Sequence, residues 1–279
     1  MTRSRIALIA GAGQFPFHVA REAKRQGIEV IAIGIRGWAE PSLAAVVDVY
    51  EELAVGELGR LIEWLRAHEI RDAVMAGKVT KSVLLDQRTA FDAEARQVLQ
   101  GARDFSVTAL LGAIGQRLAG EGIRLLDSSA LLQTQLCPAG VVTSRAPSAA
   151  EREDIEVGVR AARALATLDI GQTVIVKGRV VVAVEALEGT DAAIRRAHVL
   201  AGQGLVVVKV AAPNQDRRFD LPVIGRETLA ALTESGVTCV AVEAGTTLLL
   251  ERDALVASLN AAGLCLIGLS LTPHESRSP

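Results

Sequence analysis

The sequence predicts an α/β protein of two domains: an N-terminal domain with a Rossmann-like parallel sheet and a C-terminal mixed α/β domain, with a substrate cleft between them. In the first half, short β-branched runs alternate with longer helical patterns, the order typical of parallel strands joined by crossover helices. The 279 residues, 50% of them hydrophobic, allow about two cores at roughly 100–200 residues per domain. Residues 136–150 hold two prolines and show no sustained period. We therefore expect domains over 1–135 and 151–279, joined by a linker over 136–150.

Each expected element follows from its own pattern of apolar residues. Short β-branched runs predict strands, and apolar residues that recur every three or four positions predict helices. In the first domain the expected strands are Ile6–Ile9, Val30–Ile33, Ala73–Ala76 and Ile123–Leu126, and the expected helices are Phe15–Gln26, Glu57–Ala67 and Asp104–Glu121. In the second domain the expected elements are a helix over Glu151–Leu168, a hairpin of Thr173–Val176 with Arg179–Glu185, a helix over Asp191–Leu200, strands over Leu205–Val210, Val237–Val242 and Leu264–Leu269, and a helix over Asp253–Ala262.

Composition excludes several classes of function. Thirty Lys+Arg against thirty-two Asp+Glu give a formal net charge of −2, and aromatic residues make up 3%, so nucleic acid is not an expected partner. No stretch approaches the roughly 18–20 apolar residues of a membrane-spanning helix. The three cysteines are far apart, which fits a reducing compartment and gives no zinc spacing. The four histidines are scattered, so neither a histidine metal site nor Ser-His-Asp catalysis is indicated.

Two glycine motifs follow expected strands of the first domain. Gly11, Gly13, Gln14 and Phe15 lie where a strand gives way to a helix, so backbone N–H groups there can face a phosphate or nucleotide. The motif lacks the third glycine of a dinucleotide fingerprint, and a plain tight turn is the alternative.

Gly77 and Lys78 follow the strand Ala73–Ala76. Ligands of open parallel sheets bind beyond the carboxyl ends of the strands, so this loop and the first glycine loop are expected to line one crevice, where Lys78 can meet a phosphate. A solvated loop lysine is the alternative.

Polar motifs of the second domain surround the hairpin and the helix that follows it. Gln172 precedes the first hairpin strand, where it either contacts substrate or only turns the chain. A strand that ends in two carboxylates, Glu185 and Glu188, is followed by a Gly-Thr-Asp turn and a helix start, and such a group can hold both a hard cation and phosphate oxygens. The alternative is a simple helix cap with a local ion pair. The residues of this group are Glu188, Gly189, Thr190, Asp191, Arg195 and Arg196.

Two further candidates lie after the strand Leu205–Val210. Lys209 ends that apolar strand, and Asp220 is flanked by Phe219 and a Leu-Pro pair, which restricts the backbone. A turn aspartate before a helix near Arg226 is the alternative for Asp220.

These motifs resemble those of a known family. GAGQFP, DIGQ, EGTDAAIRR and DLPVIG occur in the order found in LpxI-type UDP-2,3-diacylglucosamine pyrophosphatases, and the resemblance spans nearly the whole chain. It implies hydrolysis of UDP-2,3-diacylglucosamine to UMP and 2,3-diacylglucosamine 1-phosphate (lipid X) in lipid A biosynthesis. It also implies a Mg²⁺ requirement, attack of water on the α-phosphorus, nucleotide binding by the first domain and catalysis with lipid binding by the second.

The resemblance also assigns residues. Asp220 matches the essential aspartate of the family, and Glu188, Thr190 and Asp191 match its EGTD segment. Since Mg²⁺ is usually held by one or two carboxylates plus substrate phosphates, we expect metal ligands among Asp220, Asp191 and Glu188, with Asp220, Asp191 and Lys209 as catalytic residues. Arg195 and Arg196 would share the remaining phosphate charge.

The resemblance further implies a cytoplasmic protein in contact with the cytoplasmic face of the inner membrane of a Gram-negative cell. A homo-oligomer is compatible with the sequence, which does not fix the oligomeric state. Two other functions fit the same motifs: a nucleotide-sugar sensor without turnover, which would bind UDP without hydrolysis, and an ATP-dependent ligase or kinase, which would consume ATP.

Overall fold

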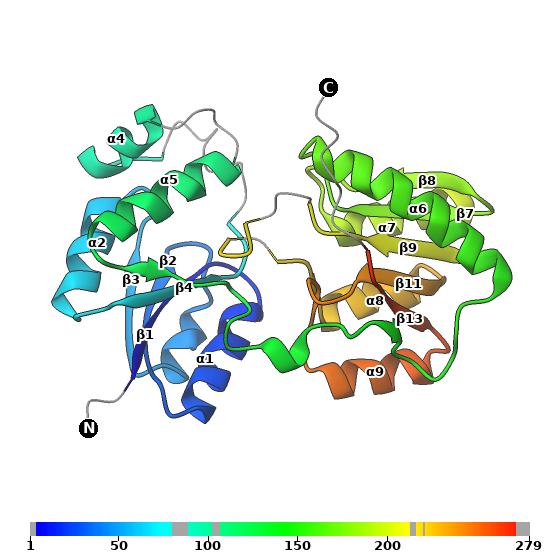
Figure 1. Ribbon diagram of the computed structural model, residues 1–279, viewed down its shortest axis with the longest axis horizontal. Helices are drawn as coiled ribbons and strands as arrows, with labels where there is room; N and C mark the ends of the chain where they lie inside the picture. The colour runs from blue at the N-terminus through cyan, green and yellow to red at the C-terminus, as the bar shows by residue number, and fades with distance from the viewer. Residues whose placement is uncertain (1–3, 80–88, 102–106, 213–215, 220, 272–279) are drawn as a thin grey trace. The chain divides into compact units, whose positions relative to one another are not determined.

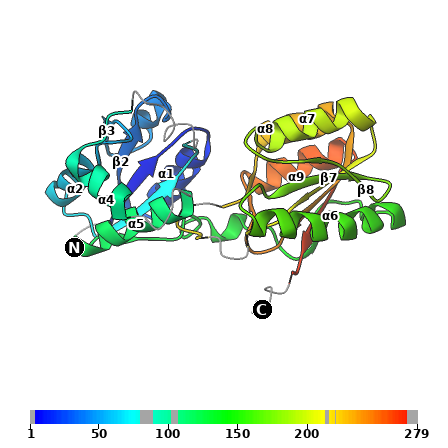
Figure 2. The same ribbon diagram turned by 90° about the horizontal axis from the view of Figure 1, so that it is seen from above.

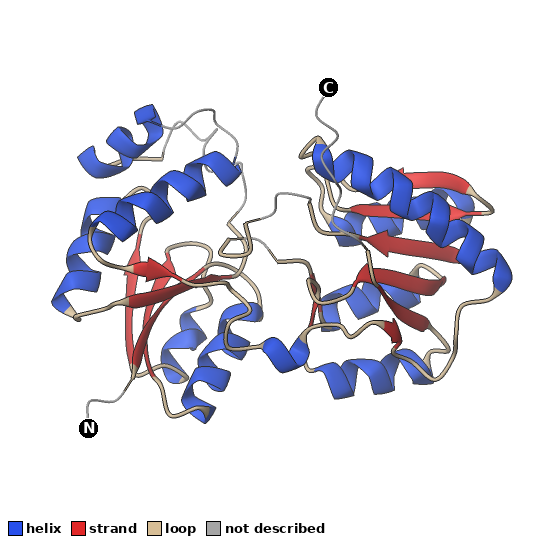
Figure 3. Ribbon diagram, viewed as in Figure 1, coloured by secondary structure: helices blue, strands red, loops and turns tan. Residues whose placement is uncertain are grey.

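The computed structural model describes residues 4–79, 89–101, 107–212, 216–219 and 221–271. They form two compact units (Figure 1). The first holds the described residues of Met1–Leu132 and Asp216–Asp220, and the second those of Gln133–Gln215 and Leu221–Pro279. Helices and strands alternate in both units, as Figure 3 shows, and the predicted α/β class is confirmed.

The sheet of the first unit is parallel throughout its described strands, in the order β3-β2-β1-β4-β5. The chain runs from β1 to β3 on one side and resumes at β4 on the other, so a topological switch point lies between β1 and β4. This is the Rossmann-like arrangement that the sequence predicts. The strands are β1 (Arg5–Ala10), β2 (Glu29–Ile35), β3 (Val49–Leu53), β4 (Asp72–Ala76) and β5 (Arg124–Leu125).

Successive strand residues point to opposite faces of this sheet, so both faces carry apolar side chains, and helices cover both. Ala7, Ile9, Ile31 and Ile33 share a core cluster with buried residues of α2, α4 and α5. Helix α1 packs against β1, β2 and β4 on the other face (Figure 1). The helices are α1 (Phe15–Arg25), α2 (Leu58–Ala67), α4 (Ala93–Gly101), α5 (Val107–Gly120) and the 3₁₀ helix η1 (Pro41–Ala45).

The second unit has a mixed sheet, also as predicted, with the described strands in the order β6-β13-β11-β9-β7-β8. Strands β9, β11 and β13 are parallel, while β6, β7 and β8 run antiparallel to their neighbours. Strand β6 lies inside the range predicted as a linker. The strands are β6 (Gly140–Val141), β7 (Thr173–Lys177), β8 (Val180–Val184), β9 (Leu205–Lys209), β11 (Val237–Glu243) and β13 (Cys265–Leu269), with a separate parallel pair β10 (Val223–Ile224) and β12 (Leu248–Leu249).

Helices cover both faces of this mixed sheet. Helix α6 lies on one face, and α7, α8 and α9 lie on the other (Figure 2). The helices are α6 (Ala149–Thr167), α7 (Thr190–Ala201), α8 (Arg226–Glu234), α9 (Arg252–Ala261) and the 3₁₀ helix η2 (Gln133–Gln135).

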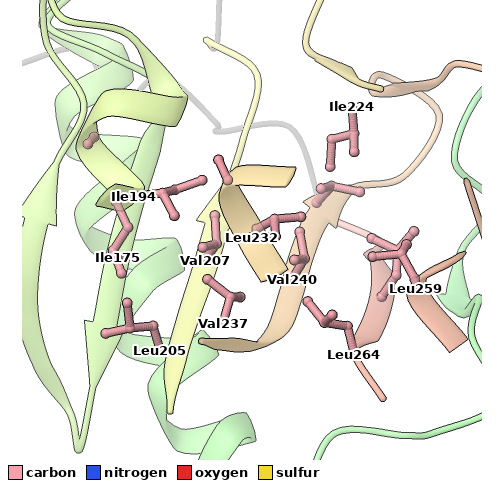
Figure 4. Packing of buried hydrophobic residues seen from close by; sticks show 14 of the residues in the cluster. Ile175, Ile194, Leu205, Val207, Ile224, Leu232, Val237, Val240, Leu259 and Leu264 are labelled. Atoms are coloured by element: carbon pink, nitrogen blue, oxygen red, sulfur yellow. The ribbon is translucent and has the colours of Figure 1, made fainter. Parts of the chain in front are cut away.

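Strand alternation decides which side chains meet α7. Val206 and Val208 of β9 belong to the core cluster beneath α6, whereas Leu205 and Val207 belong to the cluster with α7, α8 and α9. Figure 4 shows this second cluster closely packed. Because Lys209 follows Val207 by two positions, its side chain lies on the α7 face of the sheet.

Helix α6 begins with a reciprocal capping box. The Ser148 hydroxyl accepts from the Glu151 backbone N–H, and the Glu151 carboxylate accepts from the Ser148 backbone N–H. The same carboxylate binds the Arg145 guanidinium, with Nη1 and Oε2 2.8 Å apart. Arg145 also donates to the carbonyl of Thr238 in β11, so this ion pair fixes the helix start at the amino end of that strand.

Candidate functional site

The two glycine loops of the first unit are paired with each other. The Ala12 N–H donates to the Lys78 carbonyl over 2.9 Å, and the Lys78 N–H returns a bond to the Ala12 carbonyl over 3.0 Å. A Cβ atom at Gly11 would lie 2.7 Å from the Lys78 carbonyl oxygen, and one at Gly77 would lie equally close to the Ala12 carbonyl oxygen. Both glycines are therefore required by close backbone approach, and the two loops lie side by side; that they line one ligand crevice stays a prediction.

These loops lie at the switch point between β1 and β4. Gly13 has φ +91° with open space where a side chain would be, Gln14 is exposed, and Phe15 opens α1. No side chain caps the start of α1, but its second residue is a proline without an N–H, and the next two N–H groups donate to the Gln14 carbonyl. Lys78 is exposed beside them. This edge suits a nucleotide or phosphate, and whether it binds one stays a prediction.

A short segment from later in the chain also belongs to the first unit. The Ser128 hydroxyl donates to the Arg218 carbonyl over 2.8 Å, and the Ser128 N–H donates to the Arg217 carbonyl over 2.9 Å. Arg218 forms an ion pair with Asp216, and Phe219 packs against the core cluster of α2 and α5. The next residue, the predicted catalytic Asp220, lies outside the described residues.

A cluster of four polar side chains forms in the second unit at the amino end of α7. The Lys209 ammonium donates to the Thr190 hydroxyl over 2.8 Å and to the Thr173 hydroxyl over 3.3 Å. The Thr190 hydroxyl in turn donates to Glu185 Oε1 over 2.7 Å, and Glu185 Oε2 lies 3.9 Å from Lys209 Nζ. We call Thr173, Glu185, Thr190 and Lys209 the lysine cluster. It combines a cation, a carboxylate, two hydroxyls and a helix start.

Strand register explains why these residues meet. Thr173 begins β7 and lies directly opposite Lys209, the last residue of antiparallel β9. The Glu185 N–H donates to the Thr173 carbonyl, which brings the residue after β8 to the same edge. At Gly171 a Cβ atom would lie 2.1 Å from the Glu185 carbonyl oxygen, so the loops before β7 and after β8 touch through a glycine.

Two residues of the lysine cluster are buried, and the other two, Glu185 and Thr190, are half-buried. Lys209 is 9% exposed and Thr173 is 0% exposed. Burial raises the pKa of the Glu185 carboxyl, but the Lys209 ammonium and the hydroxyls of Thr173 and Thr190 outweigh burial and bring this pKa below its ordinary value. Glu185 is therefore a carboxylate at neutral pH, and the cluster holds a buried pair of opposite charges.

Two family models match this chain, one in each half. A model described as the LpxI N-terminal domain matches residues 5–135, and one described as the LpxI C-terminal domain matches residues 138–267. The chain belongs to the LpxI family.

A relative from Caulobacter vibrioides, named UDP-2,3-diacylglucosamine pyrophosphatase LpxI, is 30% identical to this LpxI family member over 287 residues, which cover 97% of this chain and 99% of the relative. Solved structures are much less similar. UDP-glucose-4-epimerase from Stenotrophomonas maltophila with bound NAD and formylated UDP-arabinopyranose is 20% identical, with 43% of this chain and 34% of that chain covered and a TM-score of 0.28. An ADP complex of N5-carboxyaminoimidazole ribonucleotide synthetase is 18% identical, with 72% and 46% covered and a TM-score of 0.27. Scores this low carry no argument about function.

Two further predicted residues of this family member lie beside α7. Gly189 is the N-cap with φ +85°, a conformation that favours glycine, and Thr190 is the first helical residue. The Gln172 carbonyl accepts from the Val210 N–H over 3.0 Å. Gln172 and Gly189 thus frame the lysine cluster through their backbones.

The two arginines predicted to bind phosphate are both exposed and lie on α7. Arg196 donates to Glu188 Oε1 over 2.6 Å and to the Val184 carbonyl over 2.8 Å. Arg195 approaches Glu234 of α8 at 3.9 Å. Arg196 and Glu188 therefore brace the loop between β8 and α7, whereas Arg195 points toward a different helix.

Of the predicted magnesium ligands that the structure describes, Asp191 has its carboxylate available to a metal ion, whereas the carboxylate of Glu188 is already hydrogen-bonded. Glu188 accepts from Arg196 with one oxygen and from the Ala186 N–H with the other, while the Asp191 carboxylate has no ion-pair or hydrogen-bond partner among the described residues. No group of three or more His, Cys, Asp or Glu side chains in the described part of the chain is placed to hold a metal ion. Asp191 with substrate phosphates suits Mg²⁺, which often uses one or two carboxylates. The predicted set with Asp220 stays a prediction.

Glu185 and Thr173 are the two cluster residues that the sequence-based site prediction leaves out. Both lie next to predicted site residues, Glu185 three positions before Glu188 and Thr173 directly after Gln172. A prediction of how β7 pairs with β9 would have found Thr173, because that pairing sets it opposite Lys209.

Among the helices that the structure describes, none combines the length and the apolar character of a membrane-spanning segment.

Proposed function

We propose that this protein hydrolyses UDP-2,3-diacylglucosamine to UMP and 2,3-diacylglucosamine 1-phosphate in lipid A biosynthesis. A relative named for this pyrophosphatase activity is 30% identical over 97% of the chain. The structural observation that supports the proposal most is the lysine cluster, because it sets a buried ammonium at a helix amino end, where phosphate oxygens bind well.

In the proposed reaction, a water oxygen forms a bond to the α-phosphorus, and the bond from that phosphorus to the bridging oxygen breaks. The bridging oxygen leaves with 2,3-diacylglucosamine 1-phosphate, and the water loses a proton. Negative charge grows on the leaving phosphate, so a fixed cation that meets it there accelerates the step. Lysine has three N–H donors, and two of those of Lys209 are given to threonine hydroxyls, which leaves the third for a phosphate oxygen.

Magnesium is part of the proposal. When bound, Mg²⁺ neutralises phosphate charge and polarises the phosphoryl group. We propose Asp191 as the ligand from the described residues and Asp220 as the second, the latter on the family resemblance. Glu188 is the weaker candidate, because both of its carboxylate oxygens already accept hydrogen bonds.

The test is incubation of the protein with UDP-2,3-diacylglucosamine and Mg²⁺ in ¹⁸O-labelled water, with and without EDTA, followed by mass spectrometry of the phosphorus products. We expect ¹⁸O in UMP, with loss of product when EDTA is added. Label in the 1-phosphate product instead would show attack on the other phosphorus. Binding of UDP without any hydrolysis would favour a sensor, and product formation that depends on ATP would favour a ligase.

The proposed substrate also sets the proposed location. UDP-2,3-diacylglucosamine carries two acyl chains, so we propose a cytoplasmic protein that contacts the inner leaflet of the inner membrane. Flotation with vesicles of phosphatidylethanolamine and phosphatidylglycerol tests this contact. Protein that stays at the bottom of the gradient, with and without substrate in the vesicles, would contradict it.

A further inference from the structure

Glu185 has an unusual environment within the lysine cluster. Its Oε1 accepts from the Thr190 hydroxyl, whereas its Oε2 is buried and has no hydrogen-bond partner among the described residues. The nearest cation is Lys209, whose Nζ lies 3.9 Å from Oε2. Among the described hydrogen bonds this side chain accepts through Oε1 alone, and the attraction of the Lys209 ammonium offsets the cost of burying Oε2.

Hydrogen-bond direction shows what Glu185 does for its neighbours. A carboxylate only accepts, so the Thr190 hydroxyl must donate to it, and the oxygen of that hydroxyl is thereby turned toward the Lys209 ammonium. Without Glu185 the Thr190 hydroxyl can turn to donate to the Thr173 hydroxyl, whose oxygen lies 3.4 Å away. The negative charge of Glu185 also matters, because Lys209 is only 9% exposed and an ammonium is costly to bury without a countercharge.

We propose that Glu185 is a positioning residue, which acts through Thr190 and by its charge to hold the Lys209 ammonium at the amino end of α7 for the substrate phosphate. Glu185 itself does not touch substrate, because its Oε2 is inaccessible to solvent and its Oε1 is engaged by Thr190. The kinetic part of this inference rests on the proposed hydrolysis.

The kinetic test is a double-mutant cycle with Glu185→Gln and Lys209→Met. Glutamine keeps the size of the side chain and removes the charge, so we expect kcat to fall roughly 10- to 100-fold with KM nearly unchanged. In the Lys209→Met background the same substitution should lower kcat no further, because nothing is left to position. A wild-type kcat for Glu185→Gln, or an equal loss in both backgrounds, would overturn the inference.

Glu151→Gln is the matched control. Glu151 is also a buried carboxylate paired with a cation, but its partner Arg145 binds the amino end of β11, whereas Lys209 pairs with Val242 near the carboxyl end of that strand. The control should lose stability and keep its kcat. If it lost kcat as Glu185→Gln does, the effect would be general loosening of the sheet, and the inference would fall.

A second readout needs no activity. The ε-ammonium of Lys209 should give an ordered, slowly exchanging ¹⁵N-¹H signal in the wild-type protein, assigned by its absence in Lys209→Met, and the signal should vanish in Glu185→Gln. If the wild-type protein hydrolyses nothing, the proposed function fails, but this signal still decides the inference. Its persistence in a folded Glu185→Gln protein would overturn it. If that variant does not fold, Glu185→Asp replaces it, since one carbon less withdraws the carboxylate from Thr190.

Discussion

At the scale of residues, two ion pairs with low exposure lie at opposite ends of the parallel strands of the mixed sheet. Arg145 with Glu151 fixes the start of α6, and Lys209 with Glu185 lies beside the start of α7. The first pair serves helix capping, and the second lies among the residues proposed to meet phosphate. The same chemical pairing therefore supports stability at one end and, as proposed, catalysis at the other.

The Arg145 guanidinium, against the opposing effect of burial, lowers the pKa of Glu151 to about 2. Because this folded-state value lies below the unfolded one, the contribution to stability is present above about pH 4.5 and is lost as pH falls through about 2. Because the Arg145 side chain is 36% exposed and water screens the pair, Glu151→Gln should lower the free energy of unfolding by about 1–2 kcal/mol at pH 7. Urea denaturation at pH 7, 4 and 2 checks this, and a difference that does not shrink with acid would contradict it.

Lys209→Met is expected to lower kcat by about 10²–10³-fold, because a phosphate loses its fixed cation. Steady-state kinetics with UDP-2,3-diacylglucosamine measures this. Lys177→Met is the matched control: Lys177 is at the other end of β7, and its ammonium donates to the Ala201 carbonyl. Equal losses in the two variants would show that Lys209 has no special part in turnover.

Sequence reasoning found Lys209, Thr190 and Gly189 because each stands at the end of a clear strand or the start of a clear helix. Glu185 belongs to the same motif but is not among the predicted site residues, because only its backbone bond to Thr173, which lies opposite Lys209, shows that it faces that lysine. Chain order alone does not say which of several neighbouring carboxylates points inward.

At the scale of elements, the contact between the loops before β7 and after β8 depends on Gly171. Gly171→Ala sets a Cβ atom 2.1 Å from the Glu185 carbonyl oxygen, so the loops must part. We expect a loss of about 1–3 kcal/mol in stability together with lower kcat, measured by urea denaturation and kinetics.

The matched control for this prediction is Gly112→Ala. Gly112 lies inside α5 with open space where a Cβ atom would be, so alanine there should stabilise by roughly 0.5–1 kcal/mol. If Gly171→Ala behaved like this control, the loop contact would not constrain the lysine cluster.

Most long elements were predicted, but helix α4 (Ala93–Gly101) was missed. The expected helix Glu151–Leu168 corresponds to α6, and the hairpin to β7 and β8. Strand β3 was missed because Glu51 and Glu52 interrupt its apolar pattern at the sheet edge. Strands β6, β10 and β12 have two residues each, too few for any period, and they exist only through pairing with distant partners.

At the scale of the whole molecule, the segment Asp216–Phe219 joins the first unit although it lies far along the chain. Phe219→Ala should therefore weaken the core around α5, by about 2 kcal/mol for a partly buried aromatic. Hydrogen exchange measured by mass spectrometry should show faster exchange in α5 than in the wild-type protein. Val199→Ala, at a position 83% exposed, serves as the control, and unchanged exchange in α5 of the Phe219 variant would contradict the packing.

The same segment bears on how the protein is made. On the ribosome, Leu132 emerges 87 residues before Phe219, and at roughly 5–20 residues per second that interval is about 4–17 s. During this time the first unit is present without the aromatic ring that packs on its core, so its surface beside α5 is exposed to chaperones and proteases. Two family models match the two halves of the chain separately. We nevertheless expect that halves from different relatives cannot be joined freely, because the segment that packs on the first unit is carried by the C-terminal half.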